Sequence, residues 1–535
     1  MPASSTARPA SRIMLAVFGS RILGLVREVV MNSLFGAGRE MDAFLAAFRI
    51  PNLLRDLFAE GALSTAFVAT FSKKLATEGQ VAAFRLANLV SSTTMVAMAA
   101  IVLLGILGAE GLVGLIGWGA QEDPAKLALT VSLTRIMFPF ILLVSMAAVW
   151  MGLLNSLGSF GLPASASTAF NVVSIATGLA CGWLFDPEFG PRAIHGFAVG
   201  TVLGGAAQWL IQVPKARSLG YRPRWAWDLS DPGLREVLRL MAPAVVGGAA
   251  VQVNVLVNTS FAFTLEEGAV TCLNNAFRLM QLPIGLFGVA IATVTLPSVA
   301  RSAALADPEA VRGKLREGLR LSTFLTLPAA TGLVLLALPV VRLIFERGAF
   351  TLEDSRHTAW ALQAYAAGLA AYAAIKVLSP AFYALGLPRV PLRVSLIGIA
   401  LNLVLNSVFI FVLGWGLAGL ALSTSLVALI NCAQLVLALR RPLGGLAAPG
   451  FHAALGKIAL AAGIMAAGVA GAEAVLRPWL EAGFLARLAG TLALVGAGGG
   501  LFFGAALALR LEETAVLLRL ARRFSGRGDA GGGAA

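Results

Sequence analysis

Charged residues lie inside stretches of this chain that are otherwise apolar. The first such stretch contains Arg21, Arg27 and Glu28. A charge at the centre of a bilayer costs about 2.5–3.5 kcal/mol on insertion scales, so these side chains are expected to face water or one another rather than lipid. A second and a later stretch continue the pattern with Asp42, Arg49, Arg55, Asp56, Glu60 and Arg278. The set predicts a hydrated cavity within a membrane.

Helical spacing separates charges that can pair from charges that cannot. Asp42, Arg49 and Asp56 are seven residues apart, close to two full turns, so they are expected to stack on one helix face, with Glu60 one turn further on. Arg55 should point about 100° away from Asp56 and be harder to neutralise within its own helix. A structural ion-pair network with snorkelling near helix ends is the alternative interpretation, and for Arg49 it is as good.

That alternative explains the remaining arginines poorly, because the nearby acids are too few to neutralise all of them. The guanidinium fork matches phosphate oxygens, so a surplus of arginine indicates an anionic, phosphorylated ligand. The predicted ligand-binding residues are Arg21, Arg27, Arg49, Arg55 and Arg278. The predicted gating or charge-balancing acids are Glu28, Asp42, Asp56 and Glu60.

The composition sets the class of protein. The chain has 535 residues, of which 58% are hydrophobic and 13% charged, and its mean hydropathy is +0.83. Soluble domains are about 25% charged, so one large water-soluble core is excluded and a membrane protein is predicted. The net charge of +14 is too diluted by apolar sequence to indicate nucleic-acid binding, and a face beside anionic lipid explains it better.

Apolar runs long enough to cross about 30 Å of hydrocarbon predict fourteen transmembrane helices. Lys and Arg are concentrated in alternate loops, which predicts that both termini are cytoplasmic. The predicted spans are 12–34, 42–70, 85–108, 127–154, 163–185, 193–213, 236–263, 268–300, 319–341, 357–385, 391–413, 416–439, 453–475 and 484–508.

An internal repeat has an offset of about 229 residues. Ala47-Phe48-Arg49 recurs as Ala276-Phe277-Arg278, and Gly119-Ala120 recurs as Gly348-Ala349. The offset carries the second predicted span onto the eighth, a shift of six helices, so the halves should have the same topology. Parallel repeats of this kind are typical of alternating-access transporters, with the substrate between the lobes.

Local motifs resemble those of the bacterial lipid II flippase family. They are Ser20-Arg21-Ile22-Leu23-Gly24, Phe35-Gly36-Ala37-Gly38, Phe48-Arg49-Ile50-Pro51-Asn52-Leu53-Leu54-Arg55, Phe58-Ala59-Glu60-Gly61-Ala62 and Arg278-Leu279-Met280 with Leu282-Pro283. The resemblance implies an all-α fold with a cationic central cavity, and a groove for the polyprenyl tail at the last two helices. It implies two six-helix lobes, 1–214 and 215–440, then helices 13 and 14 in 441–510 and a cytoplasmic amphipathic or disordered tail, 511–535.

The resemblance also implies a substrate and a membrane. The substrate is undecaprenyl-diphosphate-linked saccharide peptide (lipid II), moved from the cytoplasmic to the outer leaflet of the bacterial inner membrane for cell-wall synthesis, where other cell-wall proteins are conceivable partners. No enzyme activity or cofactor is expected. A monovalent ion, Na⁺ or Cl⁻, stays a hypothesis; some relatives bind sodium, for which the candidate oxygen donors here are Asn254, Asn402, Asn406 and Thr424.

In the expected mechanism, the arginines bind the diphosphate in the inward-open state and the acids hold or release them as the lobes rock. Pro51 and Pro283 absorb the bending. Three alternatives remain. A cation-coupled multidrug or polysaccharide-lipid exporter would need excess cavity carboxylates, a membrane transferase would need catalytic acids or histidines at a membrane face, and a cell-wall assembly scaffold would not transport at all.

Overall fold

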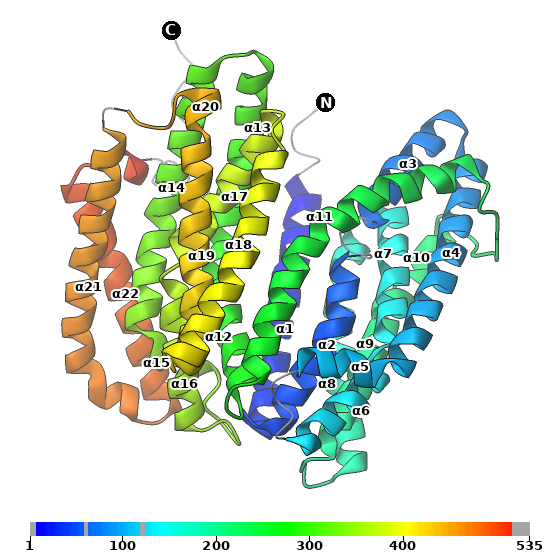
Figure 1. Ribbon diagram of the computed structural model, residues 1–535, viewed down its shortest axis with the longest axis horizontal. Helices are drawn as coiled ribbons and strands as arrows, with labels where there is room; N and C mark the ends of the chain where they lie inside the picture. The colour runs from blue at the N-terminus through cyan, green and yellow to red at the C-terminus, as the bar shows by residue number, and fades with distance from the viewer. Residues whose placement is uncertain (1–6, 58–62, 118–122, 449, 516–535) are drawn as a thin grey trace. The chain divides into compact units, whose positions relative to one another are not determined.

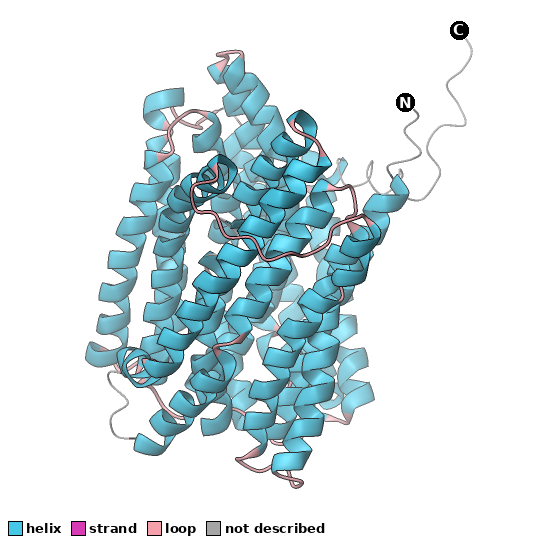
Figure 2. Ribbon diagram, turned by 90° about the vertical axis from the view of Figure 1, so that its right-hand side faces the viewer, coloured by secondary structure: helices cyan, strands magenta, loops and turns pink. Residues whose placement is uncertain are grey.

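A computed structural model describes residues 7–57, 63–117, 123–448 and 450–515 of the chain. Every regular element within these residues is a helix, and none of them forms a strand (Figure 2). The predicted all-α membrane class is therefore confirmed.

Fewer helices are long and apolar enough to count as membrane spans than the sequence predicts. Within the described residues ten helical stretches qualify, or eleven if the pair α16 (Leu352–Ala366) and α17 (Leu369–Ala384), bent by 44°, is one span. The predicted count of fourteen is not confirmed and stays a prediction. The helices that cover the other predicted spans are α1 (Ala7–Phe35), α2 (Arg39–Leu54), α3 (Ser64–Thr77) and α11 (Pro232–Phe263).

The chain divides into two compact units, and the first comprises residues 1–271 with 347–351. Its helices are labelled in Figure 1. Besides α1, α2, α3 and α11, they are α4 (Gln80–Leu107), α5 (Ala109–Ile116), α6 (Pro124–Met137), α7 (Phe140–Ser156), α8 (Gly161–Phe185), α9 (Ala193–Leu210) and α10 (Val213–Ser218).

The second unit comprises residues 272–346 and 352–535, and α12 (Ala269–Pro283) runs from the first unit into it. A π-helix, η2 (Ile284–Gly288), continues α12 directly. Besides α16 and α17, the helices that follow are α13 (Val289–Ala304), α14 (Pro308–Leu335), α15 (Ala337–Ile344), α18 (Arg389–Ser407), η3 (Val408–Val412), α19 (Gly416–Ala438), α20 (Arg440–Leu443), α21 (Phe451–Glu481) and α22 (Phe484–Ala508).

Three helices begin at the same sequence device. In each, an aspartate side chain accepts a hydrogen bond from a backbone N–H of the first turn, and a proline occupies the first helical position, where its missing N–H is not needed. The pairs are Asp123-Pro124 at α6, Asp231-Pro232 at α11 and Asp307-Pro308 at α14. The start of α6 matters most for the site, because it places Lys126.

Small residues let α8 and α9 pack closely in the first unit. A Cβ atom on Gly196 would lie 2.2 Å from the backbone nitrogen of Gly182, and one on Gly200 would lie 2.7 Å from that of Gly178. Only glycine permits so close an approach. Small residues are common where membrane helices pack, because helices in lipid associate through close van der Waals contact rather than through the hydrophobic effect.

In the second unit α21 and α22 form a hairpin beside α14 (Figure 1). Phe324 of α14, Met465 of α21 and Phe502 of α22 are buried in one apolar cluster. Residues of α14 and α21 line both cavities described below for this unit, and α22 lines the apolar one.

Candidate functional site

The charged segment of α1 contains one exposed arginine and one buried ion pair. Arg21 is exposed. Arg27 Nη2 lies 3.3 Å from Glu28 Oε1, and the Glu28 side chain is almost completely buried. The Arg27 guanidinium also lies 5.2 Å from the centre of the Phe170 ring of α8, on which α1 packs. A cation over an aromatic face is stabilised by the ring quadrupole, so α8 helps to orient Arg27.

Asp42 of α2 is completely enclosed, with none of its surface exposed. Its Oδ2 atom accepts hydrogen bonds from Lys126 Nζ and the backbone N–H of Gly268, both at 3.0 Å. Its Oδ1 atom accepts from the backbone N–H of Thr271 at 2.9 Å and from the Thr271 hydroxyl at 2.7 Å. Both carboxylate oxygens of this buried side chain therefore have two donors each.

Gly268, in the connection between α11 and α12, and Thr271, in the first turn of α12, supply three of these four donors. Thr271 follows Asp42 by 229 residues, the offset of the internal repeat, so the two repeat-related positions are in contact. Gly268 has φ of +87°, and a Cβ atom there would lie 2.3 Å from the carbonyl oxygen of Ala37. Glycine is therefore required where this connection meets the turn between α1 and α2.

Lys126 was not predicted as a site residue. Its side chain is buried, its Nζ lies 4.5 Å from the centre of the Phe263 ring, and it pairs with Asp42 across 84 residues of sequence. A lysine within the first turn of an apolar span was the available indication, because a charge there needs a partner. The sequence could not say which acid that partner was.

Arg55 lies beside an acid, contrary to expectation. Its Nη2 and Nε atoms lie 2.8 and 3.2 Å from Asp56 Oδ1, and Gln252 of α11 donates to Asp56 Oδ2 at 3.3 Å. The expectation that Arg55 is hard to neutralise within its own helix is wrong. Residues 55–57 form a π-helical turn, and a long arginine side chain spans the angle between neighbours. Arg27 likewise pairs with the acid that follows it in the sequence, Glu28.

The other predicted residues are distributed over both units. Arg49 is half-buried in α2, within the first unit. Arg278 is half-buried in α12 and belongs to the second unit. Glu60 lies outside the described residues. Convergence of the arginines on one cavity stays a prediction.

Both predicted hinge prolines lie close to a change of helix type. Pro51 is inside α2, which continues into the π-helical turn at 55–57. Pro283 is the last residue of α12 and is followed by η2. Such wider turns are where helices bend, but hinge motion itself stays a prediction.

Two of the four residues considered for sodium, Asn402 and Asn406, are hydrogen-bonded to each other in the second unit. Asn406 Nδ2 donates to Asn402 Oδ1 at 3.2 Å, and the Ser423 hydroxyl donates to Asn406 Oδ1, so both amide oxygens already accept hydrogen bonds. Thr424 donates to the Leu420 carbonyl, while Asn254 belongs to the first unit. Among the described residues no group of three or more His, Cys, Asp or Glu could hold a metal ion. This donor set does not fit a sodium ion well.

An apolar groove of about 450 Å³ lies in the second unit. It is lined by α14, α15, α21, α22 and the end of α12 with η2. Phe324, Pro328 and Gly332 line it from α14, while Met465 and Phe502 line it from α21 and α22. Its walls suit a hydrocarbon chain.

The α21–α22 hairpin is fastened to α15 by a second charged cluster. Arg342 Nε and Nη2 lie 2.5 and 2.9 Å from the two carboxylate oxygens of Glu346, and Arg487 Nη1 lies 3.1 Å from Glu346 Oε1. Burial alone would raise the pKa of Glu346, but the hydrogen bonds and positive charges of Arg342 and Arg487 outweigh it and hold that pKa below its usual value.

The fold defines the class of protein. A solved structure described as the inward-facing conformation of a multidrug resistance MATE family transporter of the MOP superfamily superposes with a TM-score of 0.68 at 14% identity, covering 79% of this chain and 94% of that one. The chain therefore has the fold of this superfamily of multi-span membrane transporters.

Sequence similarity defines the family. The family model described as lipid II flippase MurJ matches residues 31–490. A probable lipid II flippase MurJ of Vibrio cholerae is 36% identical over 78% of this chain and 79% of its own length, and a lipid II flippase MurJ of Burkholderia cenocepacia is 34% identical over 80% and 84%. A structure described as lipid II flippase MurJ, inward closed conformation, has a TM-score of 0.76 at 26% identity, covering 93% and 98%. The chain belongs to the MurJ family, which confirms the resemblance.

Proposed function

We propose that this chain flips lipid II across the bacterial cytoplasmic membrane, from the inner to the outer leaflet. The observation that carries the proposal is the match of the MurJ family model to residues 31–490. A transporter, rather than an enzyme or a scaffold, is the function that the names of its relatives support.

In the proposed cycle the diphosphate of lipid II binds the arginines Arg21, Arg27, Arg49, Arg55 and Arg278. Arg27 and Arg55 each rest on the acid that follows them, at 3.3 and 2.8 Å. A diphosphate has more acceptor oxygens than one carboxylate and can displace it from the arginines. When the diphosphate leaves, Arg27 and Arg55 pair with Glu28 and Asp56 again. These acids then serve as the charge balance between transport steps.

The rest of the proposal follows the chemistry of an amphiphile. The polyprenyl chain occupies the apolar groove beside α21 and α22 while the polar head crosses between six-helix lobes at 1–214 and 215–440, with Pro51 and Pro283 as hinges. Both termini are cytoplasmic. Asp42 and Glu60 contribute to gating. Coupling to sodium or chloride stays a hypothesis, and no step here depends on it.

Substitution of the arginines tests the proposal. Arg55→Ala and Arg278→Ala should abolish the appearance of lipid II head groups on the far side of proteoliposomes while insertion stays normal. Arg477→Ala is the matched control, because that side chain is 76% exposed and pairs only locally with Glu481 in α21. Full transport by well-inserted Arg55 and Arg278 variants would disprove the arginine site, and no transport by the unaltered protein would disprove the function.

A further inference from the structure

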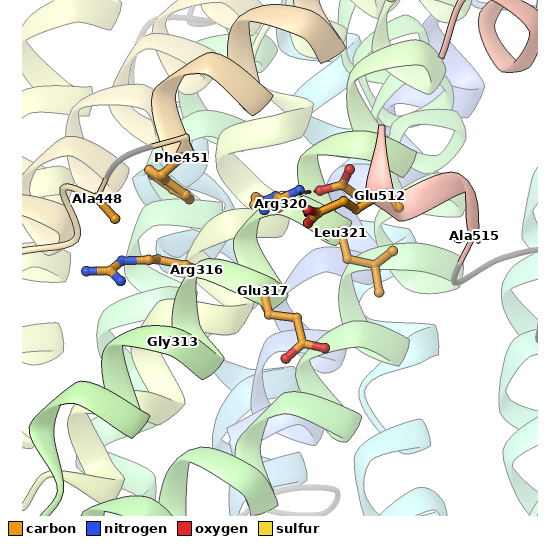
Figure 3. A pocket seen from close by; sticks show the side chains of 10 residues that line it. Gly313, Arg316, Glu317, Arg320, Leu321, Ala448, Phe451, Glu512 and Ala515 are labelled. Atoms are coloured by element: carbon orange, nitrogen blue, oxygen red, sulfur yellow. Dashed lines mark hydrogen bonds and ion pairs between the residues drawn. The ribbon is translucent and has the colours of Figure 1, made fainter. Parts of the chain in front are cut away.

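A cavity of about 620 Å³ lies in the second unit, on the first turns of α14 (Figure 3). The beginning of α21 and the residues that follow α22 complete its walls. Its lining is mixed: Arg316 and Arg320 are cationic, Glu317, Glu512 and Glu513 are acidic, and the remainder is small or apolar. None of these residues has a part in the proposed transport site.

The cavity and the apolar groove are lined by successive stretches of α14. Arg316 and Arg320 line the cavity, and Phe324, Pro328 and Gly332 continue the same four-residue spacing into the groove. Residues at this spacing lie above one another on a helix, about 6 Å apart. Each step of four residues turns about 40° around the helix axis, so this row winds around α14 while it changes from charged to apolar, as a membrane lipid changes from head group to acyl chain.

The charged groups of the cavity are held in position but are not all saturated. Arg320 donates from Nε to Glu513 at 2.6 Å and from Nη2 to Glu512 at 2.9 Å, which uses two of its five N–H donors. Arg316 donates to the carbonyl groups of Leu446 and Ala447 and, from Nη1, to Glu309 at 3.3 Å, which uses three of its five N–H donors.

Glu513 provides the opposite charge. Glu513 is only 5% exposed, and its Oε2 atom is buried without a hydrogen-bond partner among the described residues. A buried carboxylate oxygen of this kind is costly unless a donor reaches it. The cavity thus offers N–H donors for a phosphate and, beside them, the Glu513 carboxylate, whose covered Oε2 atom meets a cationic donor if the side chain turns.

We propose that this cavity binds the head group of phosphatidylethanolamine, with the phosphate at Arg316 and Arg320 and the primary ammonium at Glu513. Two cationic and three acidic side chains disfavour a purely anionic head group such as phosphatidylglycerol. Phosphatidylcholine carries the same charges, but its trimethylammonium group has no N–H to donate to Glu513. The acyl chains run along α14 toward the groove.

Lipid titrations of the purified full-length protein, followed by native mass spectrometry, test this site. Phosphatidylethanolamine should bind more tightly than phosphatidylcholine or phosphatidylglycerol of the same chain length. Glu513→Gln removes the charge and should weaken phosphatidylethanolamine binding by about tenfold, as expected for loss of a charged hydrogen bond. Glu481→Gln, which alters an exposed ion pair at the end of α21, is the matched control and should bind like the unaltered protein.

A second variant keeps the test decisive if Glu513→Gln is poorly folded. Gly313 lines the cavity, and a Cβ atom there meets nothing within 4 Å, so Gly313→Phe places a bulky side chain in the space without removing a charged group. It should also weaken phosphatidylethanolamine binding. Equal affinity for the three lipids, preference for phosphatidylglycerol, or unchanged binding by well-folded Gly313→Phe would overturn the proposal, and none of these outcomes depends on lipid II transport.

Discussion

Asp42 in the first unit and Glu346 in the second each join segments that are distant in sequence, but their partners differ in kind. Asp42 has one charged partner, Lys126, and three uncharged donors from residues 268–271. Glu346 is held by two arginines, one of them bound through both carboxylate oxygens.

The difference indicates different tasks. If residues 268–271 moved away, Asp42 would lose three donors together and still keep Lys126, so the open arrangement would not leave a bare charge in an apolar interior. At Glu346 the partners are charged, so releasing either arginine separates opposite charges even though the other arginine stays. Asp42 suits a contact that is made and broken, and Glu346 suits a permanent fastening.

The largest effect is expected for Asp42→Asn. Each carboxylate oxygen accepts two hydrogen bonds, so an amide must turn its NH₂ group against two donors, and Lys126 loses its counter-charge. Removing one partner of a buried ion pair costs about 3–5 kcal/mol. We expect loss of lipid II transport and a much lower melting temperature in detergent. A variant with unchanged stability would mean that the cluster is not closed as described.

Lys126→Met should cost less than Asp42→Asn, because the carboxylate keeps its three donors from residues 268–271. Transport should fall more than stability does. Without Lys126, Asp42 has no charged partner left when the donors of Gly268 and Thr271 move away. The melting temperature and the transport rate of the same preparations check this. Equal losses of stability in the two single variants would contradict the asymmetry between the partners.

Glu346→Gln should lower stability but spare transport by the protein that remains folded. Charged hydrogen bonds are worth about 1.5–3 kcal/mol each, and the amide keeps only part of that set. Thermal unfolding and transport per folded molecule are the measurements. A loss of transport without a loss of stability would show that this cluster moves during the cycle.

The same variant has a defined pH dependence. The pKa of Glu346 is lowered in the folded protein, so the carboxylate stabilises it fully above the ordinary value near 4.5, and this contribution is lost as the pH falls through the lower, folded-state pKa. The difference in melting temperature between the unaltered protein and Glu346→Gln should shrink in acid. A difference that grows in acid would contradict the assignment.

The smallest effect is expected for Lys73→Met. Lys73 of α3 pairs with Glu236 of α11 at 3.2 Å, but the two side chains are 65% and 42% exposed. Solvent-exposed pairs contribute less than about 1 kcal/mol. The melting temperature should therefore barely change. A shift as large as that of Glu346→Gln would mean that burial does not explain why one ion pair stabilises the protein more than the other.

Much of this organisation was predictable from local sequence. The charges of α1 and α2 marked Asp42, Arg49 and Arg55 as candidate residues, and the repeat at 229 residues was visible in the sequence, but the contact between Asp42 and Thr271 was not predicted. Partner choice was not predictable: helical angles suggested that Arg55 would avoid Asp56, whereas a π-helical turn and the reach of the side chain bring them to 2.8 Å.

Composition and hydropathy by themselves determined that this is an all-helical membrane protein, because a chain with so few charges can satisfy its backbone in lipid only through helices or closed barrels, and its apolar runs have helix length. Local motifs determined the family. Tertiary structure alone decided that Lys126 neutralises Asp42 and that Arg320 meets Glu513, which are 84 and 193 residues apart. The energy of a buried charge depends on the distance to its partner in space, and that distance is absent from the order of residues along the chain.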